Sequence, residues 1–300
     1  MTTIHDVIIV GGGPAGLQAA LTLGRMHRDV VLLDSGTYRN DRVEHMHNFV
    51  THDGTPPAEF RKQARTELAA YATVEVRDVA ATRIEHVDDV HRVTTEGGVL
   101  AARLLILATG VRDELPEVPG LAALWGTHAY TCPFCHGHEL AGRDIGILAT
   151  ETGLHLVALL APIGRAVTVF TDGADLAPEA LAAIERAGAT VDDRALLGFE
   201  AAGDGVWVSL AGGEVTVAGL FVATGRFVQA APFAGQLGLD LQASGCIAID
   251  DFGRTSRPGV FAAGDLAHRA AYPMPMASVL AAAAAGQLAA SACVQELIAH

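Results

Sequence analysis

The stretch Asp6-Val-Ile-Ile-Val-Gly-Gly-Gly-Pro-Ala-Gly16 decides the fold, because an apolar run leads directly into three spaced glycines. A short β-branched run without a polar face is typical of a strand that is buried on both sides. A helical pattern follows from Leu17 to about Met26, and a second buried strand spans residues 29–33 and ends at Asp34. The start of the chain therefore predicts a complete β-α-β unit.

The glycine spacing of this unit is the pattern of a dinucleotide site. In Gly11-x-Gly13-x-x-Gly16 the first glycine makes the tight turn, the second lets a pyrophosphate approach the backbone, and the third lets helix and strand pack closely. The N-terminus of the helix supplies partial positive charge, and Asp34, 18 residues after Gly16, can accept hydrogen bonds from the adenine-side ribose. We therefore predict that the unit binds a dinucleotide.

A second β-α-β unit is expected further along the chain, where strands at 145–148 and 166–170 flank a helix at 154–160. The stretch at 220–225 closely repeats the strand and Ala-Thr-Gly turn at 105–110, which indicates two related α/β domains. The sequence after residue 258 then completes the first domain. The expected fold class is α/β with two Rossmann-like domains, the second inserted in the first, over residues 1–115 with 244–300 and residues 116–243.

Composition and charge exclude several functions. Acidic residues outnumber basic ones by 34 to 20, and the net charge of −14 argues against nucleic-acid partners and against docking on anionic membranes. No basic n-region precedes the short apolar run at 7–10, which predicts a cytoplasmic protein. The apolar stretch at 276–294 is mostly alanine, with Ser and Gln interruptions, so a buried helix is favoured over a membrane span.

Reactive side chains concentrate in Cys132-Pro-Phe-Cys135-His136-Gly-His138. As a redox pair, two cysteines at this spacing can close a strained, easily reduced disulfide, and a neighbouring histidine can move a proton. The two cysteines and two histidines could instead ligate zinc, although four ligands within seven residues are cramped. Cys-x-x-Cys-His also matches a haem attachment site, whose maturation normally needs export. The redox interpretation is favoured, and no metal site is predicted.

Together these motifs resemble the low-molecular-weight thioredoxin reductase-like flavoproteins over essentially the whole chain, with Ala108-Thr-Gly110 and Gly264-Asp265 as further matches. The resemblance implies FAD as cofactor, an inserted pyridine nucleotide-type domain and a homodimer. It also implies that Cys135 lies against the flavin and Cys132 exchanges with the substrate, while His136 or His138 moves protons. The positions that match the family's cofactor site are Gly11, Gly13, Pro14, Ala15, Gly16, Asp34, Ser35, Arg39, Asn40, Asn48, Thr109, Gly110, Gly264, Asp265, Met276, Ala277 and Ser278.

One branch of these flavoproteins is matched better than the others. In thioredoxin reductases proper an aspartate follows the flavin-proximal cysteine, where this chain has His136. The form Cys-x-x-Cys-His-Gly-x-Glu, with Arg39-Asn40 and His45-Met-His-Asn-Phe49 upstream, is more similar to the dithiol oxidases. Those enzymes close intramolecular disulfides in compounds such as gliotoxin and holomycin.

The second β-α-β unit lacks the glycines that NADPH needs. In register, its three glycine positions hold Ala149, Glu151 and Leu154, and a carboxylate repels a pyrophosphate. No arginine cluster follows Asp172 to meet a 2′-phosphate. We therefore predict that the nucleotide site of this domain is degenerate and that NADPH is not the electron donor.

The predicted function is an FAD-dependent thiol-disulfide oxidoreductase. In it a small-molecule dithiol reduces the Cys132–Cys135 disulfide, and dioxygen accepts the electrons to give hydrogen peroxide. Two alternatives stay open. One is a thioredoxin reductase-like enzyme that uses NADPH or ferredoxin to reduce thioredoxin or another disulfide. The other is a flavin-bound redox sensor without enzymatic activity.

Overall fold

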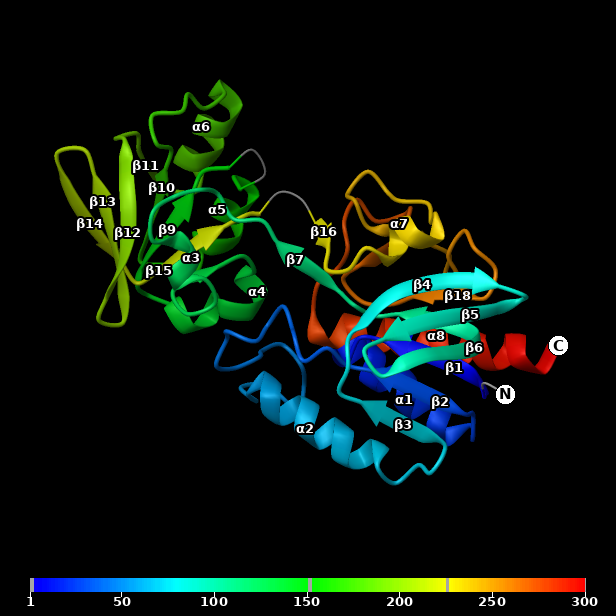
Figure 1. Ribbon diagram of the computed structural model, residues 1–300. Helices are drawn as coiled ribbons and strands as arrows, with labels where there is room; N and C mark the ends of the chain where they lie inside the picture. Colours follow the sequence, from blue (N-terminus) through cyan, green and yellow to red (C-terminus); the bar gives the residue numbers. More distant parts are fainter. Residues whose placement is uncertain (1–2, 151–152, 225–226, 300) are drawn as a thin grey trace. The chain divides into compact units, whose positions relative to one another are not determined.

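The computed structural model describes residues 3–150, 153–224 and 227–299 (Figure 1). The chain divides into two compact units. The first unit comprises residues 1–41, 55–112 and 227–300, and the second comprises residues 42–54 and 113–226. The predicted domain boundaries at 115/116 and 243/244 stay predictions from the sequence.

The first unit is built on a sheet of seven strands among the described residues, in the order β3-β2-β1-β6-β5-β4 with β18 also paired to β6. The strands β1, β2, β3, β6 and β18 run parallel, whereas β4 and β5 are antiparallel to their neighbours. Its elements are β1 (Ile4–Val10), α1 (Pro14–Arg25), β2 (Val30–Leu33), α2 (Pro57–Leu68), β3 (Val74–Arg77), β4 (Ala81–Val87), β5 (Val90–Thr95), β6 (Gly98–Leu107), α7 (Phe233–Leu237), β17 (Ile247–Ile249), β18 (Val260–Ala262), β19 (Ala267–Arg269) and α8 (Val279–Ala299), with β7 (Val111–Asp113) and β16 (Phe227–Gln229) at the crossings between the units.

Both faces of this sheet are buried, which explains why β1 has no polar face. Val7 and Ile9 pack in a core shared with α1 and α8, and Ile8 packs in a second core shared with α7. The strand predicted at 6–10 and the helix predicted from Leu17 correspond to β1 and α1. The glycine turn between them therefore lies at the carboxyl end of a buried parallel strand, where α/β proteins bind ligands.

The second unit has a five-stranded parallel sheet within its described residues, in the order β11-β10-β9-β15-β8, and a separate antiparallel sheet of β12, β13 and β14. Its elements are α3 (Leu121–Leu124), β8 (Ala129–Tyr130), α4 (Pro133–His136), η1 (His138–Leu140), β9 (Asp144–Leu148), α5 (His155–Leu160), β10 (Ala166–Phe170), α6 (Pro178–Arg186), β11 (Thr190–Asp192), β12 (Leu196–Ala202), β13 (Gly205–Leu210), β14 (Gly213–Val217) and β15 (Gly219–Val222). Both units thus contain a parallel β-α-β arrangement, and residues 113–226 interrupt the first unit in sequence. The predicted fold class is confirmed.

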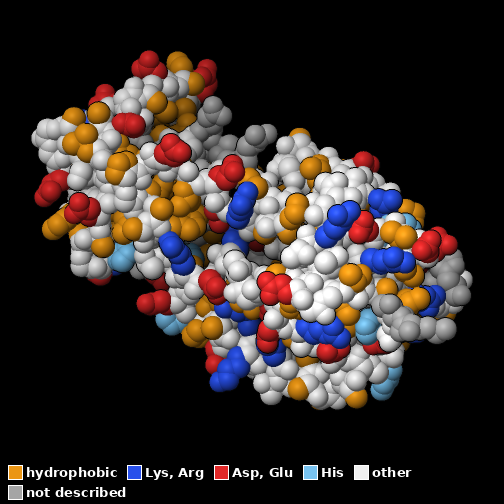
Figure 2. Space-filling view, viewed as in Figure 1, with side chains coloured by type: hydrophobic (Ala, Val, Ile, Leu, Met, Phe, Trp, Pro, Cys, Tyr) orange, Lys and Arg blue, Asp and Glu red, His pale blue; other side chains and the backbone are white. Residues whose placement is uncertain are grey.

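The charged surface and the long C-terminal helix can be compared with two expectations from the sequence, one from the net charge and one from the apolar stretch at 276–294. On the face drawn in Figure 2, acidic and basic side chains are interspersed. Within the described residues, none of the helices combines the length and apolar character that crossing a membrane requires. The alanine-rich stretch forms α8, whose Ala289, Ala290 and Cys293 are buried in the core of the first unit.

The contact between α8 and α1 depends on small residues. A Cβ atom added to Gly286 in the middle of α8 would lie 2.0 Å from the carbonyl oxygen of Ala15. No rearrangement of a side chain can relieve that overlap, because the obstacle is backbone. Gly286 therefore sets the distance between α8 and the first turn of α1.

We expect Gly286→Ala to destabilise the protein, although alanine is normally the better helix residue by about 1 kcal/mol. Forcing the two helices apart should lower the free energy of unfolding by about 1–3 kcal/mol, measured by chemical denaturation. Gly235→Ala in α7 is the matched control, because a Cβ atom at Gly235 meets nothing within 4 Å. Equal stabilities of the two variants would contradict the close helix contact.

Candidate active site

The glycine turn of the first unit has the geometry of a phosphate-binding turn. Gly11 has a φ of +120°, and a Cβ atom there would lie 2.2 Å from the carbonyl oxygen of Ala108. A Cβ atom at Gly16 would lie 1.8 Å from the carbonyl oxygen of Gly11. At Gly13, by contrast, a Cβ atom would meet nothing within 4 Å. Gly11 and Gly16 are thus required by the fold itself, and Gly13 leaves its side of the turn open to a ligand.

The N-terminus of α1 is brought together with the Gly264-Asp265 motif. Gly264 has a φ of +91°, and a Cβ atom there would lie 3.1 Å from the Cβ of Ala15. The side chain of Asp265 accepts a hydrogen bond from Arg39 Nη1 at 3.0 Å. The 12-residue helix α1 begins at Pro14 and has no side-chain N-cap, so the amides of its first turn remain for a phosphate.

Asp34 is more enclosed than the sequence suggested. It is 2% exposed, and its Oδ2 accepts hydrogen bonds from Arg65 Nη2 and Tyr38 Oη, each at 2.6 Å. Its Oδ1 accepts a bond from the amide of Gly36 at 2.9 Å. Burial, followed by the hydrogen bond to Asp34, raises the pKa of Tyr38 to about 12. A carboxylate has about four acceptor positions, so one remains for a ribose hydroxyl.

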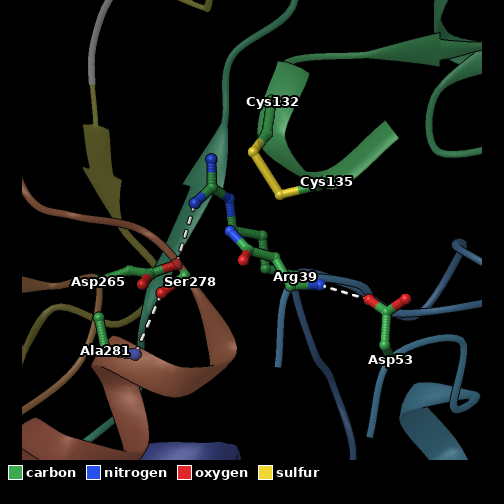
Figure 3. Close-up of a disulfide and its surroundings, with 8 residues drawn as sticks. Arg39, Asp53, Cys132, Cys135, Asp265, Ser278 and Ala281 are labelled. Atoms are coloured by element: carbon green, nitrogen blue, oxygen red, sulfur yellow. Dashed lines mark hydrogen bonds and ion pairs between the residues drawn. A yellow bond between two sulfur atoms is a disulfide. The ribbon is translucent and has the colours of Figure 1, made fainter. Parts of the chain in front are cut away.

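The other residues predicted from the resemblance to bind the cofactor are spread over several elements of the structure. Ser278 caps α8, since its Oγ accepts a hydrogen bond from the amide of Ala281 at 3.1 Å (Figure 3). Asn40 Oδ1 accepts a bond from Arg61 at 3.2 Å, and Gly110 has a φ of +70°. Ser35 and Met276 are exposed, Ala277 is half-buried, and Thr109 lies between Ala108 and Gly110 in the turn after β6. Asn48 belongs to the second unit, apart from the rest of the set.

The backbone shape and the hydrogen-bonding groups of the first unit show whether FAD could bind there. The residues present fit this cofactor. The open face of Gly13 and the free amides of α1 would hold the pyrophosphate. The remaining acceptor position of Asp34 would hold the ribose, and Asp265 with Arg39 lies beside the same helix terminus. These roles stay predictions for the individual residues.

In the second unit Cys132 and Cys135 form a disulfide, with Cα atoms 5.3 Å apart (Figure 3). Cys132 is the N-cap residue of α4, and its carbonyl oxygen accepts hydrogen bonds from the amides of Cys135 and His136 at 3.1 and 3.2 Å. Sulfur atoms that are bonded to each other are not thiolate ligands for zinc. Among the described residues, no group of three or more His, Cys, Asp or Glu is arranged to hold a metal ion.

His136, directly after the disulfide, is a half-buried imidazole. Its ring stacks on Tyr130 with centroids 4.2 Å apart and an angle of 12° between the planes. Burial lowers the pKa of His136 to about 4, against a smaller opposing effect of Glu139. Its Nδ1 has no hydrogen-bond partner among the described residues. His136 is therefore a neutral base at pH 7, whereas His138 lies exposed on η1.

The structure adds three neighbours of His136 to the predicted catalytic residues: His47 and Glu139, which the sequence analysis quoted only within family motifs, and Tyr130. His47, from the segment 42–54, lies with its ring edge-on to His136 at 6.4 Å and with Nε2 3.6 Å from Glu139 Oε1. Tyr130 supplies the stacking face for His136. Local patterns do not report these contacts, because His47 and Glu139 lie far apart in the chain. The available signals were the two family motifs that contain His47 and Glu139 and the tyrosine two residues before Cys132.

The turn after β9 differs from the turn after β1 in its side chains, although both turns begin with the same backbone hydrogen bond to the neighbouring strand. The amide of Ala149 donates to Phe170 O at 2.9 Å, as the amide of Gly11 donates to Leu33 O at 2.8 Å. Ala149 thus occupies the first glycine position, and its side chain packs against the core together with Leu154. Glu151, the second position, lies outside the described residues.

Comparisons with known proteins agree with this architecture. Residues 5–287 match the family described as pyridine nucleotide-disulphide oxidoreductase. The chain is 39% identical over 278 residues to thioredoxin reductase aclD of Aspergillus oryzae, covering 87% of this chain and 88% of that one. It is 35% identical to thioredoxin reductase sirT of Leptosphaeria maculans over 88% of each chain. The crystal structure of an oxidoreductase from Agrobacterium tumefaciens has a TM-score of 0.90 and 32% identity, covering 99% of both chains.

The chain belongs to the pyridine nucleotide-disulphide oxidoreductase family. It is a thioredoxin reductase-like enzyme, an oxidoreductase, and its cofactor is FAD. The predicted resemblance, enzyme class and cofactor are confirmed.

Two glycines of the first turn should respond differently to the same substitution. Gly13→Ala should leave the free energy of unfolding nearly unchanged and weaken FAD binding by 10-fold or more, about 1.4 kcal/mol. Gly16→Ala should destabilise the fold, because its Cβ atom would overlap a backbone oxygen. FAD dissociation constants from fluorescence and denaturation curves separate the effects. Parent-like FAD affinity in Gly13→Ala would contradict the assigned phosphate turn.

The pKa of His136 is a direct test of its burial. Titration of its ring signals by NMR should give a midpoint near pH 4, and Tyr130→Ala should raise the midpoint toward 6.5 by exposing the ring. A midpoint near 6.5 in the unaltered protein would show that His136 is solvated and not the neutral base described above.

Proposed function

We propose that the enzyme oxidises a small-molecule dithiol to an intramolecular disulfide through the Cys132–Cys135 pair, with dioxygen as terminal acceptor. The contrast between the two glycine turns supports this direction of electron flow. The first turn keeps Gly11, Gly13 and Gly16, while the second has Ala149 in the first glycine position and a core-packed Leu154 in the third. We infer that the nucleotide site of the second unit is degenerate, so that reducing equivalents come from a thiol substrate.

The charges around the second turn support the same inference. Residues 171–185, which follow β10, contain four acidic residues and no lysine or arginine. One of them, Asp172, accepts a hydrogen bond from the amide of Leu196 at 2.6 Å through its Oδ1. The 2′-phosphate of NADPH normally meets arginine at this edge of the sheet. An acidic edge repels it, whereas a neutral dithiol is not affected.

Thiol-disulfide exchange at α4 accounts for the chemistry of the substrate. The first substrate sulfur forms a bond to Cys132 Sγ, the Cys132–Cys135 bond breaks, and Cys135 leaves with the electron pair. The second substrate sulfur then attacks the first, and Cys132 leaves as a thiolate. The substrate loses two electrons and two protons, and the cysteine pair gains the two electrons.

His136 is the base for this exchange, because its imidazole is neutral at pH 7 and follows Cys135 in α4. Phe134, between the two cysteines, is 69% exposed and offers an apolar surface to a substrate at the disulfide. When bound, FAD would supply the two-electron acceptor chemistry that links the reduced cysteine pair to dioxygen. A homodimeric state and a cytoplasmic location stay predictions from the sequence and the resemblance.

Oxygen consumption by the FAD-loaded enzyme tests the proposal. With dithiothreitol and a panel of rigid small dithiols in air, we expect one dioxygen consumed and one hydrogen peroxide formed per disulfide, at a rate that NADPH does not change. Cys135→Ser should lose turnover entirely, while the surface variant Lys62→Ala should keep it. No oxygen uptake, together with rapid reduction of the enzyme by NADPH, would overturn the proposal.

The names of the relatives favour a second candidate, a reductase that uses NADPH or ferredoxin to reduce thioredoxin or another disulfide. Stopped-flow mixing of the enzyme with thioredoxin and each donor in turn distinguishes the two directions. Reduction of thioredoxin at a rate above the dithiol-dependent oxygen uptake would select the reductase.

A further inference from the structure

His47 is held in a built cluster beside the disulfide, within the second unit. Its Nδ1 lies 3.5 Å from Asp53 Oδ1, and its Nε2 lies 3.6 Å from Glu139 Oε1. Asp53 also accepts a hydrogen bond from the amide of Asn48 at 2.8 Å, which fixes the segment that carries His47. Each ring nitrogen of His47 therefore has a carboxylate oxygen within ion-pair distance.

This cluster connects the buried His136 with solvent. The His47 and His136 rings meet edge-on with centroids 6.4 Å apart, a separation that one bridging water can span. The exposed fraction of the side chain is 20% for His47, 40% for Glu139 and 69% for Asp53. On its other face His136 is closed by Tyr130, whose hydroxyl donates to the carbonyl of Thr127. Among these groups His136 therefore has two partly exposed polar neighbours, His47 and Glu139, and of the two only His47 is an imidazole.

The chemistry at Cys132 requires such a neighbour. A dithiol gives up two thiol protons in succession, and each must leave before its sulfur can form a bond. One buried imidazole accepts one proton at a time. His136 must therefore pass on the first proton before it can accept the second.

We propose that His47, positioned by Asp53 and Glu139, is the second proton carrier of the enzyme, which takes the first thiol proton from His136 so that the mixed disulfide can be resolved. When the first substrate sulfur bonds to Cys132, its proton goes to His136, and Cys135 leaves with the electron pair. The proton passes to His47. The second thiol proton then goes to His136 as the second sulfur attacks the first and releases Cys132. Two electrons end on the cysteine pair, and both thiol protons leave through His136 and His47 to solvent.

Further titratable groups described near the cluster include His45 and Glu44. The ring of His45 lies 6.4 Å from that of His47, and Glu44 with Glu139 contributes to raising the pKa of Tyr130, after the larger effect of burial. Glu139 lies three residues after His136, on η1, so its carboxylate can act on both histidines.

The inference deepens the proposed function, since it rests on thiol exchange at Cys132, but it is independent of the final electron acceptor. Anaerobic single turnover of the enzyme with dithiothreitol therefore tests it, with acid quenching and intact-mass analysis. In His47→Gln, whose amide NH2 group can still donate to a carboxylate but cannot take up a proton, we expect the mixed disulfide to accumulate and its resolution to slow by 10-fold or more. Glu139→Gln should show a smaller slowing, and the pH profile of resolution should change in both variants.

Matched controls separate proton transfer from structure. Imidazole in solution should restore resolution in His47→Ala, which a purely structural defect would not allow. His128→Gln, a histidine in the same unit bonded to Thr127 Oγ1, should resolve the mixed disulfide as the parent does. Parent-like resolution in His47→Gln, or no rescue by imidazole, would overturn the inference. Absence of oxygen uptake with normal, His47-dependent exchange would instead overturn only the proposed oxidase function.

Discussion

The contact between Gly16 and the carbonyl oxygen of Gly11 is the steric constraint on which the first unit depends. At this point helix α1 passes so close to the strand β1 that a single Cβ atom would lie 1.8 Å from a backbone oxygen. Gly286 in α8 imposes the same condition from the other side, where an added Cβ atom would lie 2.0 Å from the carbonyl oxygen of Ala15. Together these approaches place the N-terminus of α1 beside Gly264 and leave the amides of its first turn for the pyrophosphate of FAD.

The second unit has the same parallel strand arrangement as the first, but it lacks the glycine at the start of the turn after its first β-α-β strand. Ala149 occupies the position of Gly11 with the same backbone hydrogen bond, and α5 has six residues where α1 has 12. A parallel sheet is stabilised by its buried strands, so its fold does not depend on a ligand at this turn. At α4 the unit carries a disulfide that is followed by an imidazole kept neutral by burial. The proposed function uses the unit for proton and thiol exchange.

The parts of the fold that follow from short-range patterns could be predicted from the sequence. Buried strands such as β2 (Val30–Leu33) appear as continuous apolar runs, and the glycine spacing marks the turn that follows β1. The parts that could not be predicted depend on residues far apart in the chain. Arg65 bonds to Asp34 across 31 residues, and the segment 42–54 joins the second unit although its sequence neighbours belong to the first. No periodicity reports such pairings, so the partners of Asp34 and the position of His47 required the structure.

The direction of electron flow is measured most directly by anaerobic titration of the flavin absorbance with a dithiol and, separately, with NADPH. A thiol-driven enzyme should lose its oxidised flavin absorbance in proportion to added dithiol and show no comparable change with a several-fold excess of NADPH. Stoichiometric loss of the absorbance with NADPH, and none with dithiols, would contradict a degenerate nucleotide site and the oxidase function together.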